Sequence, residues 1–207
     1  MLSIKSPRRA GGFSLVELMV ALVVGLIVVG AVLALVVAIT KSNRQTLQST
    51  RLNQELRATL AMVASDLRRA RSVSDPLTTA KATGGNPYSD IDTSTADCLH
   101  YGYEDAPGGD WHVVRRVTSD TPVRLVLFSG ASVTCTTSTG GVPLGSKQVE
   151  ITAFSVTPST TTTALKKGTR RFDITITGQL VDQDAELNSI SRTMTQTVYI
   201  RSIGSGS

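Results

Sequence analysis

The sequence predicts an α+β fold in which one long N-terminal helix packs on an antiparallel β-sheet head. Two properties of the N-terminal part predict the helix: Leu18–Ile39 contains no charged side chain, and apolar residues then recur at helical spacing. The chain from Val73 onward is rich in Ser, Thr, Gly and β-branched residues in short alternating segments, which predicts the head. We expect the helix to span a membrane in its lower half and to be amphipathic in its upper half.

Residues 1–12 form a short polar leader that contains Lys5, Arg8 and Arg9 but no acidic residue. A positively charged segment ahead of an apolar stretch stays on the cytoplasmic side, so the C-terminal part is expected to be exported. Lys41 and Arg44 follow the apolar stretch and weaken this charge asymmetry slightly. The pattern predicts a single-pass inner-membrane protein whose head lies in the periplasm.

Residues 13–39 are the predicted transmembrane helix. At about 1.5 Å per residue, the uncharged part alone spans about 33 Å, which is enough to cross the hydrocarbon core of a bilayer. A cleaved signal peptide has a shorter apolar core followed by a small-residue cleavage site. A buried helix of a soluble domain rarely holds more than about 10–14 purely apolar residues, so the membrane interpretation is preferred.

Residues 40–72 are predicted to continue the same helix as an amphipathic stalk. Neither Pro nor Gly occurs from Ala31 to Ser74, and Asp75-Pro76 provides the stop. We therefore expect a near-continuous helix from Phe13 to about Ser72, about 90 Å long. Apolar residues three or four apart form one stripe that a sheet or a partner helix must cover: Leu52, Leu56, Leu60, Val63, Leu67 and Ala70.

Residues 73–207 are predicted to form the exported β-rich head. Gly- and Pro-containing turns separate the expected strands, and the Thr-rich tract from Thr157 to Thr163 is expected to be an exposed loop. No second amphipathic helix is expected, so the stalk stripe should pack on the sheet. The expected strands are Cys98–Tyr103, His112–Thr118, Val123–Phe128, Lys147–Val156, Arg171–Leu180 and Ser191–Arg201.

The segment from Gly12 to Leu18 reads GFSLVEL and joins the leader to the helix. It resembles the processing and methylation site of type IV pilins and type II secretion pseudopilins. In that family a membrane-embedded prepilin peptidase cuts after the Gly and methylates the new N-terminal residue. The resemblance implies a pilin-like fold, cleavage between Gly12 and Phe13, N-methylation of Phe13, and an acidic residue, Glu17, at the fifth mature position.

Glu17 is chemically unusual at its position because it lies just inside an apolar segment. A carboxylate at the centre of a membrane helix costs roughly 2.5–3.5 kcal/mol on insertion scales. The resemblance implies that Glu17 meets the terminal amine of a neighbouring subunit as helices bundle into a filament. Phe13 of the same chain is also one helical turn away, so Glu17 can instead cap its own N-terminus, or lie as a solvated acid at the membrane interface.

Two further segments indicate which pilin group the chain resembles. The segments Ala64–Ala70 (ASDLRRA) and Gln196–Arg201 (QTVYIR) are similar to the helix end and closing strand of W-type minor pilins and J-type pseudopilins. We favour a W-type minor pilin that initiates or caps a type IV pilus. The alternatives are a J-type pseudopilin of a type II secretion system, or a pilin-borne adhesin or DNA-binding tip subunit. The absence of a mid-membrane Pro and the large Thr-rich head argue against the abundant shaft subunit.

The resemblance also implies the partners: prepilin peptidase, other major and minor pilins, the inner-membrane pilus assembly machinery and membrane lipid. Nucleic acid is a possible partner of a tip subunit, through Arg115-Arg116 or Lys166-Lys167 with Arg170-Arg171. The charge distribution does not support it, because residues 74–207 hold eleven basic and thirteen acidic side chains. Residues 40–73 hold seven basic and two acidic side chains, so the basic excess lies on the stalk.

Cys98 and Cys135 lie on the exported side of the predicted topology, where two cysteines ordinarily form a disulfide. A zinc site with His100 and His112 is the alternative, although its spacing fits no common zinc module. Two histidines and 4% aromatic residues exclude a multi-histidine metal site and large base-stacking surfaces, and 41% hydrophobic residues exclude a disordered chain.

Acidic residues at alternating positions suggest calcium loops, but they lack the Gly and the terminal Glu of an EF-hand. Solvated loop acids are the preferred interpretation, with no cofactor and no metal. The sequence shows no nucleophile motif, so no catalytic residue and no enzymatic activity are predicted. The two acidic groups are Asp90, Asp92 and Asp97, and Asp182, Asp184 and Glu186.

Overall fold

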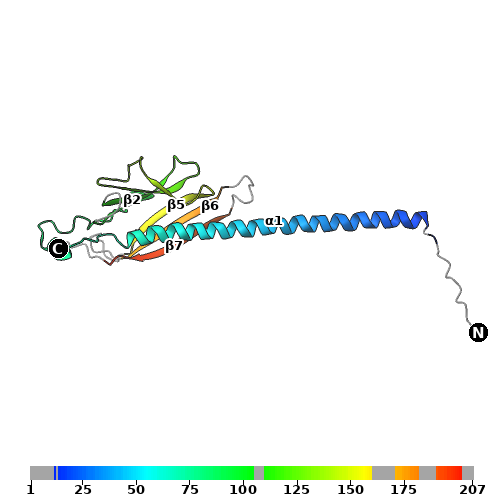
Figure 1. Ribbon diagram of the computed structural model, residues 1–207, viewed down its shortest axis with the longest axis horizontal. Coiled ribbons are helices and arrows are strands. Elements are labelled where there is room, and N and C mark those ends of the chain that lie inside the picture. Colours follow the sequence, from blue (N-terminus) through cyan, green and yellow to red (C-terminus); the bar gives the residue numbers. More distant parts are fainter. Residues whose placement is uncertain (1–11, 13, 105–109, 160–170, 182–189, 202–207) are drawn as a thin grey trace, which may run out of the picture. The chain divides into compact units, whose positions relative to one another are not determined.

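The computed structural model describes residues 12, 14–104, 110–159, 171–181 and 190–201 (Figure 1). The chain divides into two compact units, Met1–Thr46 and Leu47–Ser207. The helix α1 (Leu15–Leu67) begins in the first unit and ends in the second. The expected α+β class, with a long helix packed on antiparallel sheet, is confirmed.

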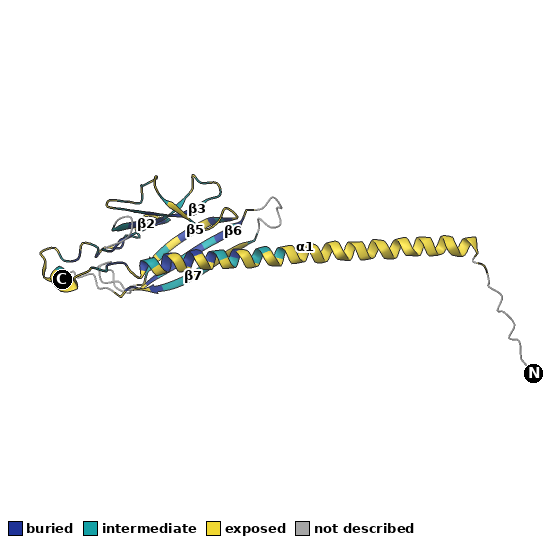
Figure 2. Cartoon of the chain, viewed as in Figure 1, coloured by how far each residue is buried: buried dark blue, intermediate teal, exposed yellow. Residues whose placement is uncertain are grey.

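The first unit contains the apolar part of α1. Its large apolar side chains between Leu15 and Ile39 are 51–75% exposed, and Figure 2 shows this part of the helix as exposed throughout. Among the described residues, α1 is the one helix that is long and apolar enough to cross a membrane, judged by length and composition. Side chains of this kind on every face of a helix require an apolar surrounding, which a bilayer provides.

In the second unit, one face of α1 is buried in the head. The six residues of the predicted stripe are between 0% and 5% exposed, so the stripe and its interior position are confirmed. They share one core with apolar residues of both sheets, including Leu99, Leu125, Phe154 and Ile174. The spacing of three and four residues keeps these side chains on one face, which is why the helix end and the sheets form a single core.

The helix ends at Leu67 and not near Ser72 as expected. The last turn tightens, because Arg69 N donates to Asp66 O at 2.9 Å and Ala70 N donates to Leu67 O at 3.1 Å. Arg71 then takes a left-handed conformation with φ of 65°. Its N–H donates to Gly102 O at 2.8 Å, so the chain leaves the helix to bond a strand end.

A second, short helix, α2 (Pro76–Lys81), follows the predicted stop at Asp75-Pro76, in a part of the chain where only strands and loops were expected. Asp75 is its N-cap and accepts hydrogen bonds from Leu77 N and Thr78 N, both at 3.1 Å. An acidic N-cap followed by Pro at the first helical position is a helix-start signal, so the dipeptide begins a new helix after α1 has already ended at Leu67.

The first sheet has the strand order β1-β2-β3-β4 and is antiparallel throughout. Three strands match predicted segments, whereas β4 was not expected because a three-residue strand containing Pro143 is indistinguishable from a turn in sequence. The strands are β1 (Cys98–Gly102), β2 (Trp111–Val117), β3 (Arg124–Gly130) and β4 (Val142–Leu144).

The second sheet has the order β5-β6-β7, with strands β5 (Val149–Pro158), β6 (Arg171–Leu180) and β7 (Ser191–Tyr199). The alternation predicted for β6 is confirmed, because Phe172, Ile174 and Ile176 are at most 1% exposed while their neighbours are not buried. Gly178 admits the helix: a Cβ on this residue would lie 2.9 Å from Leu56 Cδ2. The expected loop from Thr157 to Thr163 is partly wrong, since Thr157 and Pro158 belong to β5 and residues 160–163 lie outside the described residues.

The strands were expected to form one sheet, but they form two. After β4 the chain turns at Gly145, with φ of 95°, next to Glu55 and Thr59 of α1. Glu55 accepts hydrogen bonds from the backbone N–H and the hydroxyl of Ser146. This turn at the helix places β5 in the second sheet. A hydrogen bond of 2.8 Å from Ile151 N of β5 to Val123 O, the residue before β3, links the two sheets.

Candidate functional site

The sequence-predicted processing segment lies at the start of α1. Gly12 is exposed and precedes the helix, and a Cβ on it would meet nothing within 4 Å. Phe13 lies outside the described residues. Glu17 is in the first turn of α1, where a negative charge interacts favourably with the positive end of the helix dipole, and it is exposed. The segment therefore presents an accessible Gly immediately before a helix that begins with an acid.

In the head, Cys98 of β1 is joined to Cys135 by a disulfide with a Cα–Cα distance of 6.0 Å. Arg115 adds a second attachment, because its Nη1 donates to Cys135 O at 2.7 Å. The two bonds hold the segment around Cys135 over a small apolar cluster that includes Val113, Val126 and Phe128. The disulfide therefore covers one face of the first sheet while the other face packs on α1.

The zinc alternative does not fit this arrangement. A cysteine in a disulfide has no thiolate to offer a metal, so Cys98 and Cys135 cannot act as zinc ligands here. His112 is 3% exposed and its Nδ1 lies 3.2 Å from Ser129 Oγ, so it is held inside the head. No group of three or more potential metal-binding side chains occurs within the described parts of the chain.

Two of the acidic residues suggested as calcium ligands, Asp92 and Asp97, are used for other contacts. Asp97 accepts two hydrogen bonds from the guanidinium of Arg116, at 2.8 and 3.1 Å. Asp92 Oδ1 accepts hydrogen bonds from the N–H and hydroxyl of Ser94, at 2.8 and 2.6 Å. The second acidic group, from Asp182 to Glu186, lies outside the described residues.

The basic residues suggested for nucleic acid are likewise engaged where they are described. Arg116 pairs with Asp97, and Arg115 bonds the backbone of Cys135 and lies 5.4 Å from the ring centroid of Phe128. Arg171 lies 3.7 Å from Asp173, while Lys166, Lys167 and Arg170 lie outside the described residues. The described arginines of these runs therefore each have a partner within the head.

A polar cluster at the end of α1 was not predicted from the sequence. Asp66 accepts hydrogen bonds from the hydroxyl groups of Tyr101 and Tyr103, the latter at 2.6 Å. Both tyrosines are at most 2% exposed. Burial and the Asp66 carboxylate raise the pKa values of both phenols, so they remain protonated donors at neutral pH. The cluster fastens the last turn of the helix to β1.

His112 and Arg69 complete this cluster. The imidazole stacks on Tyr103 at 4.6 Å between ring centroids, and its Nδ1 lies 3.6 Å from Asp66 Oδ2. Burial lowers the pKa of His112, with Asp66 opposing the shift and Arg69 adding to it, so the ring is neutral at neutral pH. Arg69 lies over Tyr103, 4.6 Å from the ring centroid. The only sequence signal for this cluster was the two-residue spacing of Tyr101 and Tyr103, which places both side chains on one face of a strand.

The geometry defines a class of protein: a chain with an apolar N-terminal helix, an acid in its first turn, and an amphipathic continuation packed on antiparallel sheets is pilin-like. The comparisons with known proteins agree. Residues 7–33 match the prokaryotic N-terminal methylation motif. Residues 45–200 match the family described as prepilin peptidase-dependent protein B, which covers most of the chain. The chain belongs to this family of prepilin peptidase-dependent proteins, and it is a structural protein and not an enzyme.

No curated protein and no solved structure matches the chain. The two family matches cover different parts: one covers the processing segment and the start of the apolar helix, and the other covers the stalk and the head. Together the two matches identify pilin-type sequence in both compact units.

Proposed function

We propose that the protein is a minor pilin, cut between Gly12 and Phe13 by prepilin peptidase, N-methylated at Phe13, and incorporated into a type IV pilus at or near its tip. Residues 1–12 are then the cleaved leader, 13–39 the transmembrane helix, 40–72 the stalk and 73–207 the periplasmic head. The subunit waits in the inner membrane as a single-pass protein before it joins the cell-surface filament. The observation that carries the proposal is the methylation-motif match over residues 7–33, which covers the processing segment and the start of the apolar helix.

Assembly is the mechanism of this function. The apolar side chains of α1 leave lipid and pack against other pilins, so van der Waals packing supplies most of the cohesion. Glu17 neutralises the amine that cleavage creates on Phe13 of a neighbouring subunit, which fixes the register between the two helices. An unpaired carboxylate in an apolar bundle is costly, so the two helices are held in the one axial register that brings Glu17 to this amine. The inner-membrane assembly machinery and membrane lipid are the remaining partners of the proposal.

A W-type minor pilin is favoured over the J-type pseudopilin of a secretion system by resemblance of the helix end and closing strand. Asp66 in the last turn of α1, together with Arg69 and the left-handed Arg71 just after it, attaches the helix to the head. Co-purification distinguishes the two roles: a minor pilin is recovered with type IV pilus subunits, whereas a pseudopilin is recovered with secretion-system subunits. An adhesive or nucleic-acid-binding tip is not favoured by the paired arginines of the described head.

Processing is tested by intact-mass spectrometry of the membrane-extracted protein from cells with and without prepilin peptidase. We expect a mature chain that begins with methylated Phe13 only when the peptidase is present. A chain that still begins at Met1, or that is cut at another bond in the presence of the peptidase, contradicts the proposal.

The role of Glu17 is tested with Glu17→Ala, and Glu17→Asp is the control that keeps the charge. Glu17→Ala should be processed normally yet fail to enter filaments, because the N-terminal amine then has no partner. Glu17→Asp should retain at least part of the incorporation. Filament incorporation of Glu17→Ala at the wild-type level, measured by immunoblotting sheared filaments, refutes the charge-pairing mechanism.

A further inference from the structure

The strand β7 forms one edge of the second sheet and lies beside the upper part of α1 (Figure 1). It has nine residues and, within the described parts of the chain, it pairs with β6 alone. The register with β6 is continuous from Ser191 to Tyr199. Alternate N–H and C=O groups of such a strand point away from its neighbour, so the outer edge of β7 presents a row of hydrogen-bonding groups.

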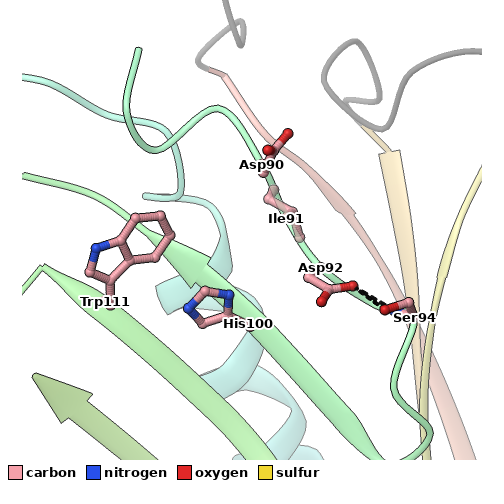
Figure 3. A pocket seen from close by; sticks show the side chains of 6 residues that line it. All are labelled: Asp90, Ile91, Asp92, Ser94, His100 and Trp111. Carbon is pink, nitrogen blue, oxygen red and sulfur yellow. Dashed lines mark hydrogen bonds between the residues drawn. The ribbon is translucent and has the colours of Figure 1, made fainter. Parts of the chain in front are cut away.

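The three other sheet edges are protected. Asp92 and His100 exchange two N–H···O bonds of 2.8 and 2.9 Å on the outer side of β1, and Figure 3 shows this segment beside the strand. The edge strand β4 has only three residues, one of which is Pro143. The strand β5 is tied to the first sheet by the bond from Ile151 N to Val123 O. Cover, shortness and Pro are the usual protection of edge strands, and β7 is neither short nor interrupted by Pro.

The side chains of β7 show that this strand is open to solvent. Tyr199 is 62% exposed, and the hydroxyl groups of Thr193 and Thr195 bond those of Thr177 and Thr175 on β6, both at 2.9 Å. These two rows of hydroxyl groups end at β7, where a further Ser or Thr on an added strand can extend them. The exposed residues of β7 are Ser191, Arg192, Thr193, Thr195 and Tyr199.

A groove of about 380 Å³ lies between α1 and β7. Arg57 and Leu60 line it from the helix, and Met194, Thr195 and Gln196 line it from the strand. Leu60 belongs to the main core and Met194 packs against that core, so both give the groove an apolar surface. Arg57 is exposed, so its guanidinium is accessible to a ligand in the groove. A strand added to β7 would therefore have a place for one of its apolar side chains.

The direction of β7 restricts which chain can supply the added strand. Gly178 pairs with Arg192 and lies against Leu56, since a Cβ on it would be 2.9 Å from Leu56 Cδ2. Gln196, further along β7, shares the groove with Leu60, one turn further along α1, so the strand and the helix run in the same direction. Antiparallel pairing with the β7 of a second copy would reverse the helix of that copy. Two helices of opposite direction cannot both enter one membrane by their N-terminal halves, so a different protein is the better occupant.

We propose that β7 binds an extended segment of a partner protein as an additional strand of the second sheet. The backbone of the segment pairs with the outer edge of β7, and one apolar side chain enters the groove beside Leu60 and Met194. Side chains of the opposite face continue the hydroxyl rows of Thr193 and Thr195, so the segment alternates apolar residues with Ser or Thr. An acidic residue at the next position on the groove face reaches Arg57.

This mode of recognition separates affinity from specificity. The main-chain hydrogen bonds to β7 supply affinity for any extended segment, and the groove selects the sequence of the segment. The proposal goes beyond the filament role, and only the argument against a second copy uses the membrane-spanning helix of the proposed function.

The probe is a synthetic fluorescein-labelled peptide, as long as β7, that alternates Thr with Ile and carries Glu in place of one Ile. The full-length protein in an uncharged detergent is titrated into the peptide, and fluorescence anisotropy measures binding. The control peptide is N-methylated on two adjacent central amides. Successive N–H groups of a strand point to opposite sides, so this change blocks both edges of the peptide. We expect saturable binding of the probe and none of the control peptide.

Hydrogen exchange measured by mass spectrometry locates the bound strand. We expect exchange in residues 191–199 to slow about tenfold when the probe is bound, because outward N–H groups gain acceptors. The strand β4, the short edge of the first sheet, is the internal control, and its exchange should not change. Absence of saturable binding, equal binding of the N-methylated peptide, or protection that does not include residues 191–199 overturns the proposal.

The matched variants are Gln196→Trp, which fills the groove, and Ser155→Trp, at an exposed position of β5 on the opposite edge of the same sheet. Gln196→Trp should weaken binding of the probe about tenfold, because the apolar side chain of the probe loses its place, and Ser155→Trp should bind like the wild type. Arg57→Gln should weaken binding of the probe about twofold to fivefold, as for an exposed ion pair, and should not affect a probe with Gln in place of Glu. Equal affinity of Gln196→Trp and the wild type overturns the proposal.

Two measurements on the wild-type protein decide the outcome if Gln196→Trp fails to fold, as judged by far-UV circular dichroism. The first is the comparison of the probe with its N-methylated control, together with the location of the exchange protection. The second is exchange of β7 without any peptide at increasing protein concentration. Protection that rises with protein concentration assigns the edge to a second copy and overturns the proposal, whereas exchange that is independent of concentration supports it.

Discussion

Replacement of Asp66 by Ala is expected to loosen the end of α1 from the head. The change removes the acceptor of two hydrogen bonds from Tyr101 and Tyr103, and both phenols are buried, so each loses its partner in an interior position. Hydrogen bonds to charged groups contribute about 1.5–3 kcal/mol each. The Asp66 side chain is 22% exposed, so water replaces part of the loss, and we expect a net destabilisation of about 2–4 kcal/mol.

The assay is thermal unfolding of the full-length chain in detergent, followed by near-UV circular dichroism of the head. The expected loss corresponds to a fall in Tm of about 5–15 °C for a domain of this size. Tyr101→Phe and the double variant Asp66→Ala/Tyr101→Phe complete a thermodynamic cycle, and Asp120→Ala is the control. A loss below about 1 kcal/mol, or additive effects of Asp66→Ala and Tyr101→Phe, would show that the cluster does not fasten the helix.

Three further predictions follow from the head. Burial lowers the pKa of His112, so just below pH 6.5 the unfolded chain binds more protons than the folded chain. This contribution to the stability of the folded state is therefore complete above pH 6.5 and is lost as the pH falls. His112→Asn should reduce this loss in unfolding curves between about pH 5 and 7. Replacing Cys98 and Cys135 by Ser should cost about 4 kcal/mol for a sequence separation of 37. Intact mass after alkylation, without and with reductant, checks that the disulfide is formed. Gly141→Ala should cost about 1–3 kcal/mol in denaturant unfolding, since its Cβ would lie 2.4 Å from Val126 Cγ1 and 2.5 Å from Phe128 Cε1.

The helix and its buried face were predictable because they depend on local periodicity. Leu52, Leu56 and Leu60 follow one another at helical spacing, and an apolar stretch with no charge has few alternative structures. The alternation of β6 was predictable for the same reason. The early end of α1 was not, because it depends on a bond from Arg71 to Gly102, which is distant in sequence.

The parts that sequence reasoning missed depend on contacts between distant residues. Asp66 meets Tyr101 and Tyr103 across separations of 35 and 37 residues, and no local pattern encodes that meeting. The division into two sheets depends on the turn at Gly145 beside α1. The proposed cleavage and methylation at Phe13 depend on a local sequence motif, so the motif alone predicts them, and what the fold adds is that Gly12 is exposed.

Two polar attachments of α1 in the described part of the head affect how tension passes through it. Glu55 bonds Ser146 in the connection between the sheets, and Asp66 bonds Tyr101 and Tyr103 at the end of β1. The two acids are eleven positions apart in the helix, about 16 Å along the axis. A pull along α1 therefore enters the head at two points and loads both sets of bonds in shear at the same time. If one set of bonds breaks, the other set and the apolar stripe of the helix bear the force.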